Sequence, residues 1–275
     1  TPVNPGLNGE RLLDTCGTGG GSGPSTFNIS TIAALVVAGA GVRVAKHGNR
    51  SFSSACGSAD VLEELGVNCG REASHWAGAL REIGIAFLFA PVLHPAVKYA
   101  QPARQELKIR TVFNLLGPLV NPAGASTQLI GASSPETAEL MAKALTGLAP
   151  ERAFVVHGSD GLDEVTLTGP TLVFEIQGNH LQQFEWEPAD FGFDPQPGES
   201  LNGGNRAHNA AIAKAVLEGE RSARRDIVLM NAAAALLVSG KAETLSQGMR
   251  LAAEAVDSGA ALNKLRLLVE FSHSP

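Results

Sequence analysis

The chain has 275 residues, of which 44% are hydrophobic, and its mean hydropathy is close to zero. A globular chain of this length buries roughly three quarters of its unfolded surface, so a full hydrophobic core is available without disulfides or structural metals. The net charge of −6 argues against a general nucleic-acid or membrane-surface binder, although a local basic pocket is compatible with it.

The three cysteines are Cys16, Cys56 and Cys69, an odd number with no C-x-x-C pair. This pattern argues against a disulfide framework and against a zinc site, so we expect a reduced, cytoplasmic protein. No apolar run of about 18 residues lacks glycine or charge, and no basic leader precedes an apolar segment. We therefore expect neither a membrane span nor a signal peptide.

The first expected elements are a short strand at Leu12 and Leu13, a glycine-rich loop and a helix from Ser30 to Gly39. Glycine permits positive φ, so successive N–H groups of residues 17–23 can converge on one point and form an anion-binding concavity. The free N–H groups and the positive dipole end of the following helix face the same point. This arrangement predicts a phosphate site.

The loop matches neither of the common nucleotide-binding motifs. A Walker A motif closes with GK[ST], which is absent here, and Ser22 stands where the dinucleotide motif has its last glycine. A second strand is expected at Val42 to Ala45, followed by KHGNR at residues 46–50 and by four serines, Ser51, Ser53, Ser54 and Ser58. Basic side chains and hydroxyls at the carboxyl end of a parallel strand extend the predicted phosphate site.

The following segments alternate between helices and apolar strands. We expect helices at 57–65, 75–83 and 135–148, a turn at 91–95 leading into a helical stretch through Leu107, and strands at 85–89, 127–132 and 153–156. This alternation predicts a largely parallel sheet with helices on both faces.

The pattern changes after residue 165. Two runs at 172–176 and 181–186 flank Gly178-Asn179, a turn pair typical of hairpins, and they predict an antiparallel extension of the sheet. Four helices are expected beyond it, the first two at 205–217 and 226–238. The second of these contains an alanine-rich run that is expected to pack closely on the sheet.

Asp163 and Glu164 lie on the loop after the strand expected at 153–156. Adjacent carboxylates on a loop are commonly just solvated. Magnesium, however, prefers one or two carboxylates together with phosphate oxygens and water. Because this pair follows a strand end on the same sheet edge as the phosphate loop, it is a candidate magnesium site.

Several motifs occur in order across nearly the whole chain: GTGG, NIST, KHGNR followed by SS and GSADVLEELG, then RTVFNLLGPLVNPA and GLDEV. Together they resemble the anthranilate phosphoribosyltransferase family, which transfers phosphoribose from 5-phosphoribosyl 1-pyrophosphate (PRPP) to anthranilate in tryptophan biosynthesis. The resemblance implies an α/β fold with a largely parallel central sheet flanked by helices, an antiparallel hairpin extension and a truncated small helical lobe. It also implies Mg2+ as cofactor.

The resemblance carries the site residues as well. It implies a metal site at Ser30, Asp163 and Glu164. It implies anthranilate contacts from Gly17, Asn49 and Arg104, the arginine binding the carboxylate in bidentate geometry. PRPP is expected to contact residues of both loops: Gly17, Gly20, Gly21, Thr26, Asn28, Ile29, Ser30, Thr31, Lys46, His47, Gly48, Asn49, Arg50, Ser51, Phe52, Ser53, Ser54 and Ser58.

No nucleophilic catalytic residue is expected. Displacing pyrophosphate from C1 of ribose builds positive charge on the sugar and negative charge on the departing oxygens, so catalysis depends on positioning and electrostatics. Lys46, the glycine-loop amides and Mg2+ are expected to carry the leaving-group charge. His47 is expected either to orient substrate or to make a structural hydrogen bond. Three further histidines are expected to be structural or to lie on the surface: His94, His157 and His208.

Two features depart from the family pattern. The family loop reads GTGGDG, whereas this chain has Gly21 in place of the aspartate and one extra residue before Thr26. Losing one charged hydrogen bond would lower activity about ten- to hundredfold. The family also carries several helices before the first strand, so we expect a fragment or a degenerate relative, and a homodimer if the helical lobe is present.

The expected division of the chain follows from that departure. An α/β domain has its first part at residues 1–93 and its second part at residues 117–275. Residues 94–116 between them are expected to be the remnant of the helical lobe.

Two alternatives stay open. Pyrimidine nucleoside phosphorylases carry a motif similar to K-x-G-R-G-L-G-H-T-G-G-T at the position where this chain has KHGNRSFSSACGS. Asn49 and the serines therefore favour the transferase. A non-catalytic relative that binds nucleotide or nucleic acid would degrade the glycine loop, as Gly21 partly suggests. The retained KHGNR motif, the Asp163-Glu164 pair and the negative net charge count against it, so nucleic acid is not an expected partner.

Overall fold

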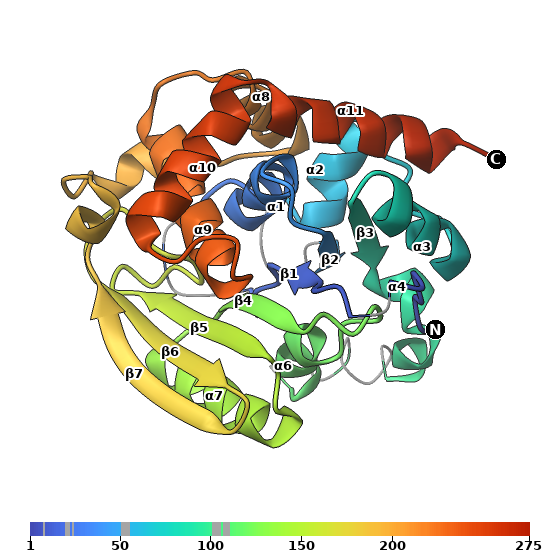
Figure 1. Cartoon of the computed structure of the whole chain (residues 1–275), viewed down its shortest axis with the longest axis horizontal. Helices are drawn as coiled ribbons and strands as arrows, with labels where there is room; N and C mark the ends of the chain where they lie inside the picture. Colours follow the sequence, from blue (N-terminus) through green and yellow to red (C-terminus); the bar gives the residue numbers. More distant parts are fainter. Residues whose placement is uncertain (8, 20–22, 24, 51–55, 101–105, 107–110) are drawn as a thin grey trace.

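The computed structural model describes residues 1–275 apart from 8, 20–22, 24, 51–55, 101–105 and 107–110. Its strands form one sheet in the order β3-β2-β1-β4-β5-β6-β7 (Figure 1). The first five strands of the chain pair in parallel, and β6 and β7 are antiparallel. This confirms the predicted mixed sheet and its hairpin extension. The strand bounds are β1 Leu13–Asp14, β2 Val44–Gly48, β3 Ile85–Phe89, β4 Thr127–Gly131, β5 Arg152–Gly158, β6 Thr171–Gln177 and β7 His180–Trp186.

Helices cover both faces of the sheet. Figure 1 shows α7 on one face of β5 to β7, and α1, α9 and α10 on the other side of the sheet. None of the described helices is both long and apolar enough to cross a membrane. The α-helical bounds are α1 Ile29–Gly39, α2 Ser58–Glu64, α3 Ala73–Glu82, α4 Ala90–Leu93, α6 Phe113–Leu116, α7 Pro135–Leu148, α8 Arg206–Leu217, α9 Ala223–Val238, α10 Leu245–Asp257 and α11 Ala260–His273. Short 3-10 helices are η1 Pro95–Tyr99, η2 Gly117–Leu119, η3 Pro188–Phe191 and η4 Gly198–Leu201.

Helix α1 is the centre of the core. It is apolar around its whole circumference and buried along almost its whole length, because it contacts β2 on one side and α9, α10 and α11 on the others. Each fully buried aliphatic side chain of this kind contributes about 1.5 to 3 kcal/mol. The helix ends against α11 so closely that a Cβ on Gly39 would lie 2.8 Å from the backbone nitrogen of Ala261. The burial of α1 therefore holds the start of the helix, where the phosphate site is predicted, in one position.

Two strands extend further than the sequence predicts. Strand β2 runs to Gly48, so Lys46 and His47 lie within the strand and not after it; they pair with Phe87 and Leu88 of β3. Both polar side chains are almost fully buried, and the ladder continues because the backbone groups have no access to water there. In the same way β5 includes His157. The turn expected at 91–95 is instead the short helix α4 followed by η1.

The sheet has a topological switch point between β1 and β4. From β1 the chain moves outward in one direction to β2 and β3, and later outward in the other direction from β4 to β5. The loops that leave the carboxyl ends of β1 and β4 therefore diverge, and open α/β sheets bind ligands at such a crevice. The glycine-rich loop follows β1 at this edge.

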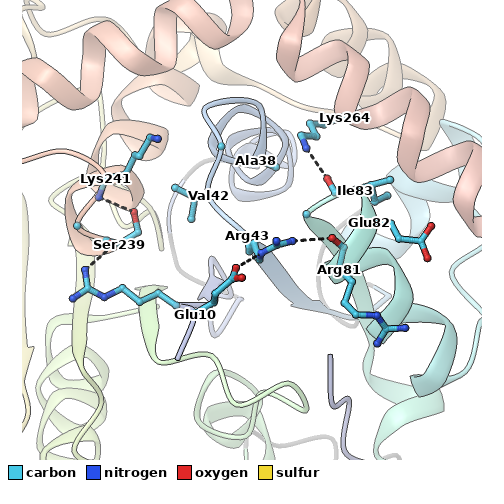
Figure 2. Close-up of a pocket in the computed structure, with 14 residues that line it drawn as sticks. Glu10, Ala38, Val42, Arg43, Arg81, Glu82, Ile83, Ser239, Lys241 and Lys264 are labelled. Carbon is cyan, nitrogen blue, oxygen red and sulfur yellow. Dashed lines mark hydrogen bonds and ion pairs between the residues drawn. The ribbon is translucent and has the colours of Figure 1, made fainter. Parts of the chain in front are cut away.

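A groove of about 560 Å³ lies at the amino-terminal ends of the strands, opposite the glycine-rich loop. It is formed among the carboxyl ends of α1, α3 and α9 (Figure 2). The last carbonyl groups of a helix lack partners within the helix and lie at the negative end of its dipole. Here cationic side chains supply the partners. Arg43 Nη1 donates to Leu80 O at 2.5 Å, and Lys264 Nζ donates to Ile83 O at 2.6 Å. The groove is thus a place where helix ends are neutralised.

We expect the change Arg43→Met to lower the free energy of unfolding by about 1 to 2 kcal/mol, because the carbonyls at the end of α3 lose a charged donor. Urea denaturation measures the effect. Lys241→Met is the matched control: Lys241 lines the same groove, is exposed, and its ammonium has no hydrogen-bond or ion-pair partner among the described residues. The control should change stability by less than about 0.5 kcal/mol. Equal losses in both variants would contradict the capping role of Arg43.

Candidate functional site

The carboxyl ends of β1 and β2 are joined by a buried polar cluster. Asp14 is fully buried at the end of β1, and its carboxylate accepts hydrogen bonds from His47 N at 3.0 Å and from Asn121 Nδ2 at 2.7 Å. Asn121 also donates to Ala45 O at 2.8 Å. Burial raises the pKa of Asp14 to about 6, while the nearby charge of Lys46 lowers it. One asparagine from the PLVNPA segment therefore fixes the two strand ends relative to each other.

Lys46 lies beneath the start of α1. Its side chain is only 4% exposed, and Nζ donates to Thr15 O at 2.8 Å. Nζ also lies 3.4 Å from Thr15 Oγ1 and 3.5 Å from Ser30 Oγ. The structure thus brings the ammonium group next to Ser30, which is one of the predicted metal ligands.

Asp163 and Glu164 meet the glycine-rich loop after β1, here called the first loop, and the start of α1. Gly19 N donates to Asp163 Oδ2 at 2.9 Å, and Ser30 N donates to Glu164 Oε1 at 3.1 Å. Burial and the adjacent charge of Asp163 raise the pKa of Glu164 to about 8, and the charge of Lys46 opposes this shift. The three predicted metal ligands therefore come together, and each carboxylate has a backbone amide as partner.

Two glycines allow this approach. A Cβ on Gly131, at the end of β4, would lie 1.7 Å from the carbonyl oxygen of Asp163. A Cβ on Gly17 would lie 2.7 Å from Asp163 Oδ2. Thr18 N also donates to Gly131 O at 2.8 Å, so the first loop, β4 and the carboxylate loop are in direct contact. A side chain at either glycine would push the carboxylates away from the amides.

The first loop is connected to the other predicted phosphate loop, which lies between β2 and α2 and is here called the second loop. Asn28, at the start of α1, donates from Nδ2 to Cys56 O at 3.1 Å. Ser58 Oγ donates to Asn49 O at 3.1 Å and accepts from Asn49 N at 3.2 Å. These bonds tie the end of β2 to the start of α2, as a common ligand for both loops requires.

Arg50 is engaged by acidic side chains of α2. Its guanidinium makes a bidentate contact with Glu63, at 2.7 and 2.6 Å, and reaches Asp60 at 3.1 Å. Hydrogen bonds to Glu63 hold the pKa of Arg50 above its usual value. The guanidinium also lies over the ring of Phe89, 5.5 Å from its centroid. A contact between Arg50 and phosphate stays a prediction.

His47 makes the structural hydrogen bond that the sequence left as one of two alternatives. Its Nδ1 lies 3.0 Å from Gly117 O, and its ring meets that of His94 edge to face, with centroids 5.0 Å apart. Burial lowers the pKa of each ring to about 4, so both are neutral at pH 7. His157 is buried against Ala132 O at 2.8 Å, and His208 is exposed.

Asp14, Cys16 and His47 offer ligand atoms within 4.8 Å of one another, which is a second possible metal cluster. Both oxygens of Asp14 already accept hydrogen bonds, and the positive charge of Lys46 acts on Asp14 and on Cys16. Burial also raises the pKa of the Cys16 thiol well above its usual value. We therefore assign no metal to this cluster. None of Cys16, Cys56 and Cys69 forms a disulfide.

Several predicted site residues lie outside the described residues: Gly20, Gly21, Ser51, Phe52, Ser53, Ser54 and Arg104. Of the others, Thr26 forms a β-bridge with Asn202, and Thr31 is buried. Ile29 is also buried, so only its backbone can reach a ligand. The roles of all these residues stay predictions.

Three groups that shape the site were not predicted from the sequence. Asp14 and Asn121 form the polar cluster behind the loops, and Gly131 permits the contact with Asp163. Asn121 belongs to the PLVNPA segment, a loop marked only by its two prolines and glycine. A charged residue at the end of an apolar strand was the available signal for Asp14. Gly131 had none, because its requirement comes from a segment 32 positions away.

Comparison with known proteins gives one consistent result. A family model described as "Glycosyl transferase family, a/b domain" matches residues 9–262. The chain is 58% identical over 273 residues to anthranilate phosphoribosyltransferase from Solibacter usitatus, covering 99% of this chain and 80% of that protein. The crystal structure of anthranilate phosphoribosyltransferase from Thermus thermophilus matches with a TM-score of 0.92 and 43% identity, over 100% of this chain and 81% of that one. The enzyme from Saccharomyces cerevisiae in complex with PRPP and Mg matches with a TM-score of 0.90 and 33% identity, over 96% and 74%.

The contact at Gly131 can be tested by adding one methyl group. We expect Gly131→Ala to lower the free energy of unfolding by about 3 kcal/mol or more, because the new Cβ would overlap the Asp163 backbone. Gly147→Ala is the control: Gly147 lies in α7 with nothing within 4 Å of the added atom. That change should stabilise the protein by up to about 1 kcal/mol. Thermal unfolding of both variants decides, and an unaffected Gly131→Ala would refute the close approach.

The raised pKa of Glu164 gives stability a pH dependence of defined sign. The folded-state value of about 8 exceeds the ordinary 4.5, so this contribution is fully present below pH 4.5 and is lost as pH rises towards 8. The pKa of Asp14 is about 6 and that of His47 about 4, so Glu164 dominates above pH 6.5. Without divalent cations, we expect the free energy of unfolding to fall between pH 6.5 and 8, and this fall to disappear in Glu164→Gln. Urea titrations across this range measure it; a fall of equal size in the variant would assign it to another group.

Proposed function

This chain belongs to the anthranilate phosphoribosyltransferase family, and we propose that it carries out the family's reaction at the sheet edge described above. It is a transferase that moves phosphoribose from PRPP to anthranilate, giving N-(5-phosphoribosyl)anthranilate and pyrophosphate. The relatives support this reaction. They give no support to the pyrimidine nucleoside phosphorylase or to the non-catalytic alternative.

The observation that carries the assignment of the site is that Glu164 meets Ser30 at the start of α1 while the adjacent Asp163 meets Gly19 in the glycine-rich loop. All their free ligand atoms are oxygens, which are the donors that Mg2+ prefers. Burial and the adjacent charge of Asp163 raise the pKa of Glu164, and a divalent cation would offset both effects. These residues therefore fit Mg2+, which would neutralise charge on the pyrophosphate oxygens of PRPP when bound.

The chain's own groups have separate tasks in this proposal. The positive dipole end of α1 attracts phosphate oxygens, which favour that end of a helix. Lys46 adds positive charge at the end of β2, 3.5 Å from Ser30 Oγ. Together they stabilise the negative charge that develops on the departing pyrophosphate. No side chain forms a covalent bond with the substrate.

Anthranilate is proposed to bind near Gly17, Asn49 and Arg104. The Asn49 side chain is exposed at the end of β2, where it can meet the amine of anthranilate. A guanidinium at position 104 matches a carboxylate in bidentate geometry. The amine must then approach C1 of the ribose in line with the departing pyrophosphate, so holding its position is the second task of the site.

We also propose that the protein acts as a cytoplasmic homodimer. Its free thiols suit a reducing compartment. The segment around residues 94–116, proposed as the remnant of the helical lobe between the two parts of the α/β domain, exposes Tyr99 by 79% and Val112 by 60%. Val120 nearby is 44% exposed. Large apolar side chains gathered in one part of the chain are typical of an interface.

The function is tested by mixing the protein with anthranilate, PRPP and Mg2+ and following the loss of anthranilate fluorescence. A chelator should abolish the loss. We expect Asp163→Asn to reduce turnover by about a hundredfold or more, because the metal site loses a charge. Glu185→Gln is the control, since Glu185 is an exposed carboxylate on β7, the strand at the end of the sheet and away from the site at β1 and β4. Undiminished turnover in Asp163→Asn would refute the metal role, and no turnover in the folded wild type would refute the function.

A further inference from the structure

A short segment at residues 202–204, here called the strap, lies directly on the first phosphate loop. Asn202 forms an antiparallel bridge with Thr26, and Gly203 N donates to Ser25 O at 2.9 Å. The contact is so close that a Cβ on Gly203 would lie 2.6 Å from the carbonyl group of Thr26. The strap leads straight into α8, so the start of that helix is held next to the loop.

Asn209, near the start of α8, connects the strap to both phosphate loops. It is 2% exposed, its Oδ1 accepts from Gly204 N at 2.8 Å, and its Nδ2 donates to Asn28 Oδ1 at 3.1 Å. Asn28 in turn donates from Nδ2 to Cys56 O at 3.1 Å. The result is one continuous chain of hydrogen bonds from the strap through two amide side chains to the second loop.

The donors and acceptors in these bonds fix the orientation of both amide side chains. Each amide uses its oxygen as acceptor and its nitrogen as donor, so neither can turn over without breaking its contacts. Because Asn209 is buried, water cannot readily replace a lost partner, and an unsatisfied buried polar group is destabilising. An aspartate at this position would keep the acceptor for Gly204 but would place an oxygen against Asn28 Oδ1.

Two further contacts join α8 to the second loop. Arg206 lies 3.5 Å from Asp60, the residue that also accepts from Gly57 N at 2.9 Å at the start of α2. Ala210 packs with Cys56 and other apolar side chains in a small buried cluster. Helix α8 thus contacts the second loop through charge, packing and the asparagine chain, and Asn209 is the member that also contacts the first loop.

We propose that Asn209 is a positioning residue for PRPP. It touches no substrate; it sets the orientation of Asn28 and thereby the distance between the two loops that bind the sugar phosphate. This inference rests on the proposed function, because PRPP is the ligand that both loops would share. It predicts a loss of PRPP binding without a comparable loss in the chemical step.

The first experiment compares Asn209→Ala and Asn209→Asp with Asn205→Ala. Asn205 is the N-cap of the same helix and accepts from His208 N at 2.9 Å, so its replacement weakens α8 without touching the asparagine chain. We expect the KM for PRPP to rise about tenfold in both Asn209 variants, with kcat and the KM for anthranilate within about twofold of wild type. Asn205→Ala should keep the wild-type KM for PRPP. An unchanged KM in the Asn209 variants, or an equal rise in the control, would overturn the proposal.

A double mutant tests whether Asn209 acts through Asn28. If it does, Asn28→Ala combined with Asn209→Ala should raise the KM for PRPP no further than Asn28→Ala alone. Additive effects would overturn the proposed route. If neither Asn209 variant folds, Asn209→Ser, which keeps a hydroxyl at the buried position but is one atom shorter than asparagine, is compared with Asn205→Ala in the same way.

Hydrogen–deuterium exchange separates this proposal from the proposed function, because it needs no turnover. Amides of residues 25–29 and 56–58 should exchange faster in Asn209→Ala than in wild type, and at the wild-type rate in Asn205→Ala. Unchanged exchange in Asn209→Ala would overturn the positioning role even in an active enzyme. If the wild-type protein shows no turnover but Asn209→Ala still exchanges faster than wild type, the positioning role stands and only the reaction is refuted.

Discussion

The close approach of the end of β4 to the backbone of Asp163 is the constraint on which the site depends. With no side chain at Gly131, the carboxylate loop reaches the amide of Gly19 in the first loop and the amide of Ser30 in the first turn of α1. The two carboxyl groups satisfy those amides, and the amides in turn hold both carboxyl groups at the switch point of the sheet. A steric requirement at one strand end therefore determines where the charge of the site lies.

The charges at this edge do not balance. Within the part of the chain that the structure describes, Asp14 and Glu164 both lie near the ammonium group of Lys46, and the charge of Asp163 acts on Glu164. Burial and the charge of Asp163 raise the pKa of Glu164, so this group holds its proton up to about pH 8. A bound divalent cation would make that proton unnecessary, and phosphate oxygens would then complete the coordination of the cation. The chain thus prepares a cation site, and it is the cation that makes the same edge suitable for a highly charged anion.

Much of the architecture could be predicted from the sequence. The pattern of apolar residues predicted β3 and α7 with their observed bounds, and the Gly178-Asn179 turn predicted the antiparallel hairpin. Strand ends were predicted less well, because β2 and β5 continue through polar residues that are buried by neighbouring segments. The same limit applies to the site. Its motif residues stood out individually, whereas the contacts at Gly131 and Asn209 join segments more than 30 and 180 positions apart and leave no local pattern.

The two edges of the sheet show why a count of basic residues does not locate an anion site. The groove at the amino-terminal edge contains more cationic side chains than the described part of the phosphate loops. Three helices end there, and carbonyl groups at the end of one of them, α3, accept hydrogen bonds from Arg43 and Lys264. At the carboxyl-terminal edge the sign is reversed, because α1 begins there and the positive end of its dipole adds to the charge of Lys46. In a parallel α/β sheet the direction of the helices therefore favours anion binding at one edge, and the cations at the other edge serve the fold.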